Sequence, residues 1–132
     1  MTDAQRDAFL RETRIAKLAT LNADGSPTIV PVWFEWDGEV ARVFTSKSSP
    51  KTKRIAADPR VALSVEEGVG VPEAWVTIEG DCTVTSEGTG ELIARLARRY
   101  YAPEQAEKSI KEWLALDIWV TLEIRPRRLR SY

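Results

Sequence analysis

The chain of 132 residues contains no histidine and only one cysteine, Cys82. Without histidine it cannot build a Ser-His or Cys-His nucleophile system, an imidazole zinc site or the commonest general base. A single cysteine forms neither an intramolecular disulfide nor a thiolate metal cluster. The composition therefore excludes the usual hydrolytic machinery, and we predict no metal site.

The sequence also lacks long apolar runs and an excess of either charge. No apolar run approaches the roughly 20 residues that span a bilayer. Residues 1–14 are too polar and charged for a signal peptide. Nineteen basic against 20 acidic residues leave a formal charge of −1, so no overall field attracts nucleic acid or a membrane surface. We expect a cytoplasmic protein that does not insert into membranes.

Apolar and charged residues are present in the proportions of a globular domain, at 43% and 30%. At this length we expect a single domain over residues 1–132. Hydrophobic periodicity predicts a mostly β fold with short α-helices, arranged as a small barrel. Strands are expected at 15–21, 28–36, 39–46, 60–66, 74–86 and 118–125. Helices are expected at 3–12, from about 50 to 58, at 89–101 and at 103–116.

Three positions in the predicted strands carry special local signals. Asp37-Gly38 is typical of a two-residue type I′ hairpin. Pro31 lacks an N–H, so it belongs either at a sheet edge or at a bulge that leaves backbone groups free for a ligand. Gly80, within a long apolar-alternating segment, indicates a bend or bulge.

The segment TSKSSPKTKR, residues 45–54, is the most informative part of the chain. Ser49 suits a helix N-cap and Pro50 the first helical position. Lys51 and Lys53 then fall in the first turn, where the helix dipole disfavours cations and attracts anions. One interpretation is a phosphate site made of helix N–H groups, hydroxyls and lysines. The other is a solvated helix end, and the spacing alone does not separate them.

A second basic cluster lies in the C-terminal sequence RPRRLRSY, preceded by Arg125. As a nucleic-acid tail it is short and lacks interleaved aromatic residues, so the edge of a cofactor groove or an ordinary solvated terminus is favoured. Most of the five tryptophans are expected in the core or a dimer interface. Trp33 and Trp75 lie beside a predicted strand irregularity or loop end, so each is a candidate to cover a planar ring.

Three segments together resemble the pyridoxamine 5′-phosphate oxidase-like split β-barrel superfamily. They are LATLNADGSPTIVPVWFEWDG, VFTSKSSPKTKRIAADPRVALSV and WVTIEGDCTV. More narrowly, they resemble its deazaflavin-dependent reductase branch, which uses coenzyme F420. The resemblance is closest over residues 14–86, and its most specific part is Lys51–Leu63. It implies a six-stranded split barrel of the flavin-reductase type, paired as a homodimer with two cofactor sites at the interface.

The resemblance also implies which residues contact the cofactor. The residues whose backbone borders the flavin-like ring, on a bulged strand, are Val30, Pro31, Val32 and Trp33. The residues that receive the phosphate and its linker are Thr45, Ser46, Ser49, Lys51 and Lys53. The residues that complete the groove, from the second subunit, are Trp75 and Val76.

On this basis the chain is predicted to be an oxidoreductase in which reduced coenzyme F420 gives a hydride to a small conjugated organic acceptor. A chain without histidine suits such a reaction, because the cofactor carries the difficult step. The alternative is an FMN-binding oxidoreductase or flavin carrier. Lys47 and Arg54 favour F420, because its tail adds carboxylates beyond the phosphate. A nucleic-acid-binding module is the third class, and we expect no nucleic-acid partner.

Overall fold

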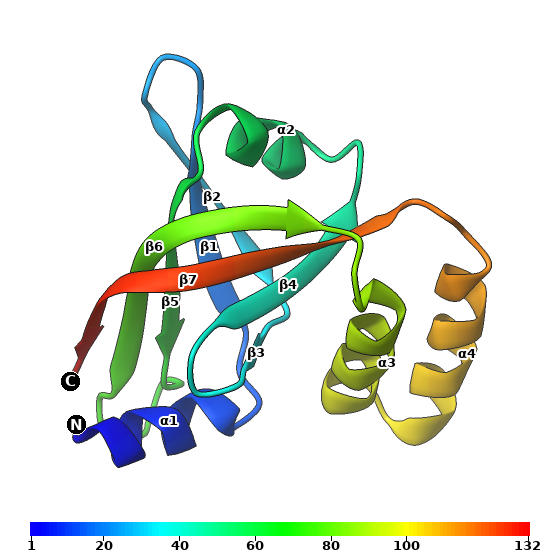
Figure 1. The fold of residues 1–132 in the computed structure, drawn as a ribbon. Helices are drawn as coiled ribbons and strands as arrows, with labels where there is room; N and C mark the ends of the chain where they lie inside the picture. The colour runs from blue at the N-terminus through cyan, green and yellow to red at the C-terminus, as the bar shows by residue number, and fades with distance from the viewer.

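Seven antiparallel strands form one strongly curled sheet in the computed structural model, which describes residues 1–132 (Figure 1). Their order across the sheet is β2-β1-β5-β6-β7-β4-β3, so β2 and β3 are its two edges. The strands are β1 Ala16–Leu21, β2 Pro27–Val32, β3 Glu35–Trp36, β4 Ala41–Ser46, β5 Arg60–Glu66, β6 Trp75–Thr85 and β7 Trp119–Ser131. The predicted mostly β fold with short helices is confirmed.

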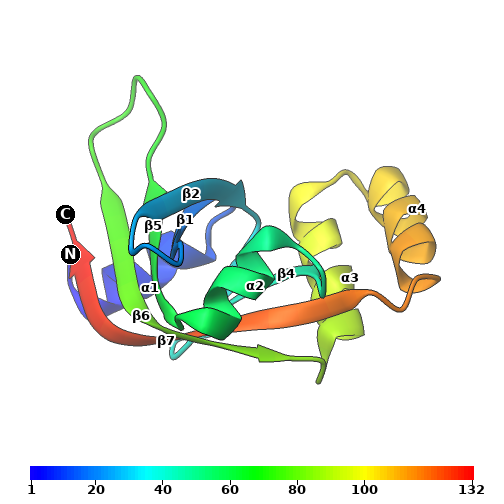
Figure 2. The same ribbon diagram turned by 90° about the horizontal axis from the view of Figure 1, so that it is seen from above.

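Four helices accompany the sheet, and none is long and apolar enough to cross a membrane. They are α1 Asp3–Arg11, α2 Pro50–Ala57, α3 Thr89–Tyr100 and α4 Pro103–Leu114. Seen from above in Figure 2, α2 lies over the opening of the curled sheet. The helices α3 and α4 pack against each other beside the sheet, and α1 lies at the end opposite α2 (Figures 1 and 2).

Apolar side chains fill the interior of the curled sheet. Buried and partly exposed residues alternate along β1 and β4, as expected for strands with one face in the core. The fully buried side chains of this interior include Leu18, Phe34, Val43, Leu63, Ile78 and Leu122. Phe9 and Leu10 of α1 and Ile55 of α2 join the same cluster. Because side chains occupy the interior, ligands have to bind on its outside or between subunits.

The sheet has seven strands rather than the six expected, because the segment predicted as one strand over 28–36 is interrupted. It leaves the ladder after Val32 and resumes at Glu35. At the break, Phe34 is fully buried, and its N–H donates to the hydroxyl of Tyr100 on α3 at 3.3 Å. The Phe34 side chain thus packs in the core, and its backbone links the break in the sheet to α3.

The predicted two-residue hairpin at Asp37-Gly38 is wrong. The last paired residues are Trp36 and Ala41, so four residues form the loop. The carboxylate oxygen Oδ1 of Asp37 accepts hydrogen bonds from the N–H groups of Glu39, at 2.8 Å, and Val40, at 2.9 Å. This side-chain turn replaces the type I′ turn because aspartate caps the following backbone groups itself.

Pro31 lies on an edge strand, as one of its two interpretations predicted. The pairing of β2 with β1 continues in register through Pro31 to Val32, so the bulge expected over Val30–Trp33 is not present. The register shift occurs instead at Glu79/Gly80 of β6, which confirms the irregularity predicted at Gly80. A Cβ on Gly80 would lie 2.1 Å from the carbonyl oxygen of Arg125, which explains the glycine.

The last strand is longer than predicted. β7 continues past residue 125 to Ser131 and pairs with β6 over nearly its whole length. Pro126 is tolerated because it lies opposite Gly80, where the ladder is already irregular. The C-terminal arginines therefore belong to a sheet strand, which the sequence pattern did not indicate.

Candidate functional site

A network of hydrogen bonds among hydroxyl groups fixes the start of α2. Ser49 is its N-cap: its Oγ accepts from the N–H of Thr52 at 3.2 Å and from the hydroxyl of Thr45 at 3.1 Å. The hydroxyl of Thr52 donates in turn to the carbonyl oxygen of Ser46 at 2.9 Å. The predicted N-cap and the predicted Pro50 at the first helical turn are both confirmed. The contribution of Thr52 was missed, because no sequence rule assigns a role to that position.

These hydrogen bonds determine which groups of the predicted phosphate-binding residues remain available to a ligand. Thr45 is buried and Ser49 is partly buried, and their hydroxyls are bonded to each other. The backbone N–H of Lys51, by contrast, has no partner within the protein. The two hydroxyls thus act mainly as a scaffold, whereas the free donors at this end of α2 are the Lys51 N–H and the cationic side chains.

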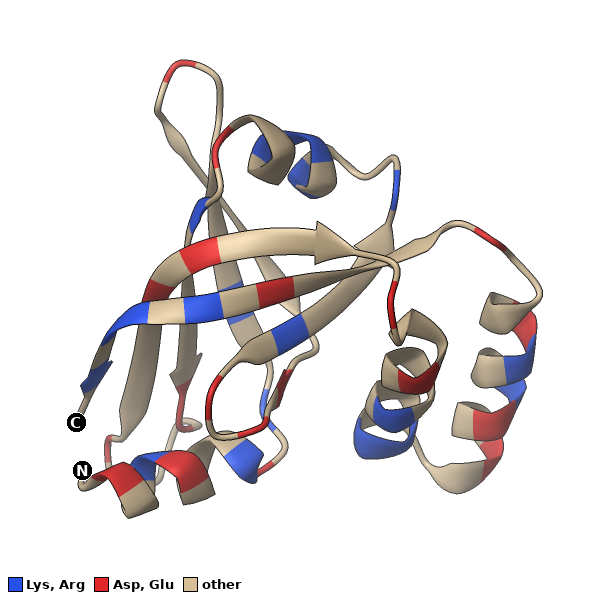
Figure 3. Ribbon diagram, viewed as in Figure 1, with Lys and Arg blue, Asp and Glu red and all other residues tan.

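The cations of α2 have no anionic partners. No carboxylate lies within salt-bridge distance of Lys51, Lys53 or Arg54. Burial lowers the pKa of the Lys51 ammonium, and the positive charge of Arg54 lowers it further. Figure 3 shows these blue segments gathered on α2, next to the open end of the sheet. The cations of α2 therefore repel one another, and a bound anionic ligand would reduce this repulsion.

Arg54 is held in place from the sheet. Its Nε donates to the hydroxyl of Thr20 on β1 at 2.7 Å, and Thr20 is only 1% exposed. The two terminal nitrogens of Arg54 make no hydrogen bond in the protein, so they remain available to a ligand.

A groove of about 660 Å³ lies beside these cations, between α2 and the turn that joins β1 to β2. Lys53, Arg54 and Arg60 contribute three positive charges to its wall. Asp24 and Asp58 also line it, and hydrogen bonds from Arg60 lower the pKa of Asp58 to about 2. Three cations against two carboxylates leave a net charge of +1 on its wall, and the cations without a partner are Lys53 and Arg54 of α2. They face the part of a ligand that extends past the start of α2.

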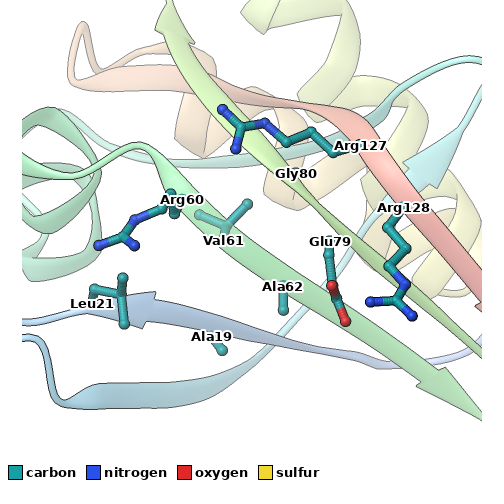
Figure 4. A pocket seen from close by; sticks show the side chains of 9 residues that line it. All are labelled: Ala19, Leu21, Arg60, Val61, Ala62, Glu79, Gly80, Arg127 and Arg128. Atoms are coloured by element: carbon teal, nitrogen blue, oxygen red, sulfur yellow. The ribbon is translucent and has the colours of Figure 1, made fainter.

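A second groove, of about 370 Å³, crosses the outer face of the sheet (Figure 4). Ala19, Ala62 and Gly80 line it with small residues, and Figure 4 shows Arg127 and Arg128 on its β7 side. Arg127 is bonded to Asp81 at 2.7 Å and Arg60 to Asp58 at 2.7 Å, so Arg128 is the unpaired cation of this groove.

The segment predicted to border the cofactor ring is placed on the edge of the sheet. Val32 is buried and Val30 packs against the core, whereas Pro31 is exposed. Because β2 is an edge strand, one side of its backbone has no strand partner. Free backbone groups are therefore present here without the bulge that was expected to expose them.

Trp33 belongs to a cluster of six aromatic side chains beside this edge. Its ring stacks on Tyr100, with centroids 5.0 Å apart and planes 4° apart, and meets the edge of Tyr101 at 4.8 Å. The other members of the cluster are Phe44, Trp113 and Trp119. Trp33 thus fastens α3 and α4 to the sheet, and its contact with Phe44 links the 30–33 segment to the 45–46 segment. Phe44 was missed, since one aromatic residue in a strand is an ordinary core signal.

Trp75 and Val76 are not brought together with the other predicted site residues within one chain. They begin β6 near the two chain termini, far from α2 in Figure 1. Trp75 stacks on Tyr132 with centroids 6.5 Å apart, and Val76 is fully buried. The resemblance assigned these residues to the groove of the second subunit, and that assignment stays a prediction.

The only cysteine does not serve as a nucleophile. Cys82 is buried on β6, and burial together with the nearby charge of Glu123 raises its pKa to about 12. Thiolates, rather than thiols, are the reactive species, so Cys82 is inert near neutral pH.

The fold and this arrangement define a class of protein, the pyridoxamine 5′-phosphate oxidase-like half-barrels. Residues 2–129 match the family model described as pyridoxamine 5′-phosphate oxidase, and the chain belongs to that family. An F420H(2)-dependent biliverdin reductase of Mycobacterium tuberculosis (strain CDC 1551 / Oshkosh) is 35% identical over 100 residues. That stretch covers 73% of this chain and 70% of the relative.

Solved structures give the same result. A conserved hypothetical protein from Mycobacterium tuberculosis is 28% identical, with a TM-score of 0.80, covering 100% of this chain and 84% of its own. A protein described as an F420 reductase is 26% identical, with a TM-score of 0.76, and 94% of each chain is covered. The family resemblance stated from the sequence is thereby confirmed.

Proposed function

We propose that this chain is a reductase that uses reduced coenzyme F420 and acts on a small conjugated organic molecule. The observation that carries the proposal is the group of unpaired cations on α2, in a chain that is 35% identical to an F420H(2)-dependent biliverdin reductase. A phosphate bearing further carboxylates suits three cations without anionic partners better than a neutral ligand does.

The residues around α2 would hold the acidic part of the cofactor. Lys51, Lys53 and Arg54 would contact its phosphate and tail, and the Lys51 N–H would donate to a phosphate oxygen. The hydroxyls of Thr45, Ser49 and Thr52, with the carbonyl oxygen of Ser46, keep these donors in place.

The ring of the cofactor would lie along the edge strand, beside the backbone of Val30–Trp33. When bound, the reduced deazaflavin supplies a hydride from its own ring. The protein's contribution is to orient cofactor and acceptor, a role that agrees with the buried, inert thiol of Cys82 and the absence of histidine.

The proposal includes a homodimer. β2 is an unpaired edge strand with Ile29 64% exposed, and Trp75 and Val76 reach a cofactor groove only if they belong to a second chain. Light scattering at micromolar concentration should report twice the mass of the chain. A monomer mass would contradict both the dimer and the assignment of Trp75 and Val76.

FMN is the second candidate cofactor, because it also carries a phosphate and the family is named for an oxidase of a phosphorylated substrate. Fluorescence titrations of the purified protein with F420 and with FMN separate the two. We expect the tighter binding for F420, since FMN has no tail carboxylates for the groove beside α2. Tight FMN binding without F420 binding would favour the flavin protein.

The reaction itself is tested with reduced F420 that carries deuterium in place of both hydrogens on its hydride-donating carbon. Biliverdin, the acceptor in the relative's name, and a simple enone are the first acceptors to examine. Mass spectrometry should find the label in the product. Oxidation of F420 with an unlabelled product would rule out direct transfer, and no oxidation with either acceptor would contradict the proposed acceptor class.

A further inference from the structure

Thr20 carries a buried hydroxyl that is used by one side chain only. It lies on β1, is 1% exposed, and its Oγ accepts from the Nε of Arg54, 34 residues away in the chain, at 2.7 Å. A buried hydroxyl normally satisfies its own hydrogen-bonding needs through backbone or neighbouring polar groups. Here it fixes a cationic side chain of a helix at the rim of the sheet.

The geometry of this contact determines what Arg54 can do. With Nε bound to Thr20, the planar guanidinium keeps its two terminal nitrogens free on one side. Two parallel N–H donors match the oxygens of a phosphate or carboxylate, a fit that a lysine ammonium does not offer.

Arg54 also borders Lys51, three residues earlier on the same face of α2. No carboxylate lies between the two, so their charges repel each other in the protein without ligand. Arg54 reaches the groove of about 660 Å³ as well, whereas Lys51 does not line it. Arg54 therefore connects the start of α2 to the groove.

We propose that Thr20 is a positioning residue: its hydroxyl orients Arg54 so that Arg54 and Lys51 bind one anionic group of the cofactor together. This rests on the proposed function, which supplies the anionic cofactor. The competing explanation is that the contact only ties α2 to β1 and contributes to stability. The two differ in whether the effect of losing the hydroxyl depends on the charge of the ligand.

The test compares Thr20→Val, which keeps the shape and removes the hydroxyl, with Thr20→Ser, which retains it. Binding of F420 and of the neutral deazariboflavin, which has the same ring without phosphate or tail, is measured by fluorescence. Thr20→Val should raise the Kd for F420 by about 5- to 30-fold, as for the loss of a hydrogen bond that serves a charged group. Thr20→Ser should stay within about twofold, and neither variant should change the Kd for the neutral compound.

Arg54→Met keeps the partly buried stem and removes the charge, so it carries the test if Thr20→Val fails to fold. It should weaken F420 by at least as much as Thr20→Val and leave the neutral compound unaffected. An equal loss for both ligands, or no loss for F420, would overturn the role of Thr20 and leave the proposed function standing. If the wild-type protein does not bind F420, the proposed function falls, and this inference falls with it.

Discussion

The chain has two basic clusters that look alike in sequence and differ in structure. On β7, Arg125 lies 3.6 Å from Glu123, Arg127 lies 2.7 Å from Asp81, and Arg130 lies 3.3 Å from Glu79. On α2, no cation has a carboxylate partner. Figure 3 shows red segments of β6 beside blue segments of β7, and blue segments without red along α2.

The difference follows from strand pairing. β7 runs beside β6, so Asp81 and Glu79 of β6 bond Arg127 and Arg130. Arg125 is bonded to Glu123 of β7 itself, and Arg128 has no carboxylate within salt-bridge distance.

α2 lies over the open end of the sheet, where Arg54 bonds the hydroxyl of Thr20. The carboxylates of the adjoining groove, Asp24 and Asp58, form no salt bridge with the cations of α2. An excess of basic residues therefore indicates an anion site where the cations form no salt bridges within the fold.

The largest effect on binding is expected at Lys51. Lys51→Ala should raise the Kd for F420 by roughly 5- to 150-fold, equivalent to about 1–3 kcal/mol for a charge-assisted hydrogen bond. Isothermal titration calorimetry measures the change. Lys108→Ala, an exposed lysine on α4, is the matched control and should leave the Kd unchanged. Equal effects in the two variants would place the phosphate elsewhere.

The pH dependence of binding should report the lowered pKa of Lys51. The anion binds the protonated ammonium, so the Kd should rise as pH passes upward through this pKa, by at most about tenfold per pH unit. Because the pKa lies below the ordinary lysine value of 10.5, the rise should begin at a lower pH than a free lysine would give. Lys51→Arg, which stays charged, should remove this early rise, and an unchanged profile would contradict the role of Lys51.

Added salt should weaken F420 binding less than Lys51→Ala or a rise in pH does. Raising the ionic strength from about 0.01 to 0.15 M shortens the Debye length from about 30 to 8 Å, and we expect a several-fold rise in the Kd for F420. The rise should be smaller in Arg54→Met, because one cation fewer attracts the ligand. A steeper salt dependence in that variant would show that other charges dominate.

The smallest effects are expected on β7. Arg127→Ala and Arg128→Ala should each change the Kd for F420 by less than about threefold, because neither lies at α2. Point substitutions are required, since removing residues 127–132 would delete the last five of the 13 residues of β7, which pairs with β6. A loss as large as that of Lys51→Ala would make the groove of Figure 4 part of the cofactor site.

Local chemistry explains which features the sequence predicted correctly. Ser49 and Pro50 start α2 because capping and the fixed φ of proline act within one turn, and Gly80 marks a bulge because its backbone is approached closely. The break at Trp33 and Phe34 depends on side-chain contacts with α3, far along the chain, so periodicity extended the strand through it.

The candidate site follows the same rule: its local signals were predicted from the sequence, and its long-range contacts were not. Lys51 and Lys53 were predicted as anion-binding residues because cations in the first turn of a helix are unfavourable unless an anion is bound there. The contact of Thr20 with Arg54 joins positions 34 residues apart, and no spacing rule connects them. The predicted role of Trp75 and Val76 is not tested by one chain, because a second chain has to bring them to the site.

The most direct test of the account is a titration of the isotope-labelled protein with F420, followed by NMR through the backbone amide and arginine side-chain signals. The largest shifts should fall on Lys51, Lys53 and Arg54, and the signals of Arg125–Arg130 should move little. Shifts concentrated on Arg125–Arg130, with α2 unaffected, would show that the β7 cluster binds the cofactor and would contradict the account.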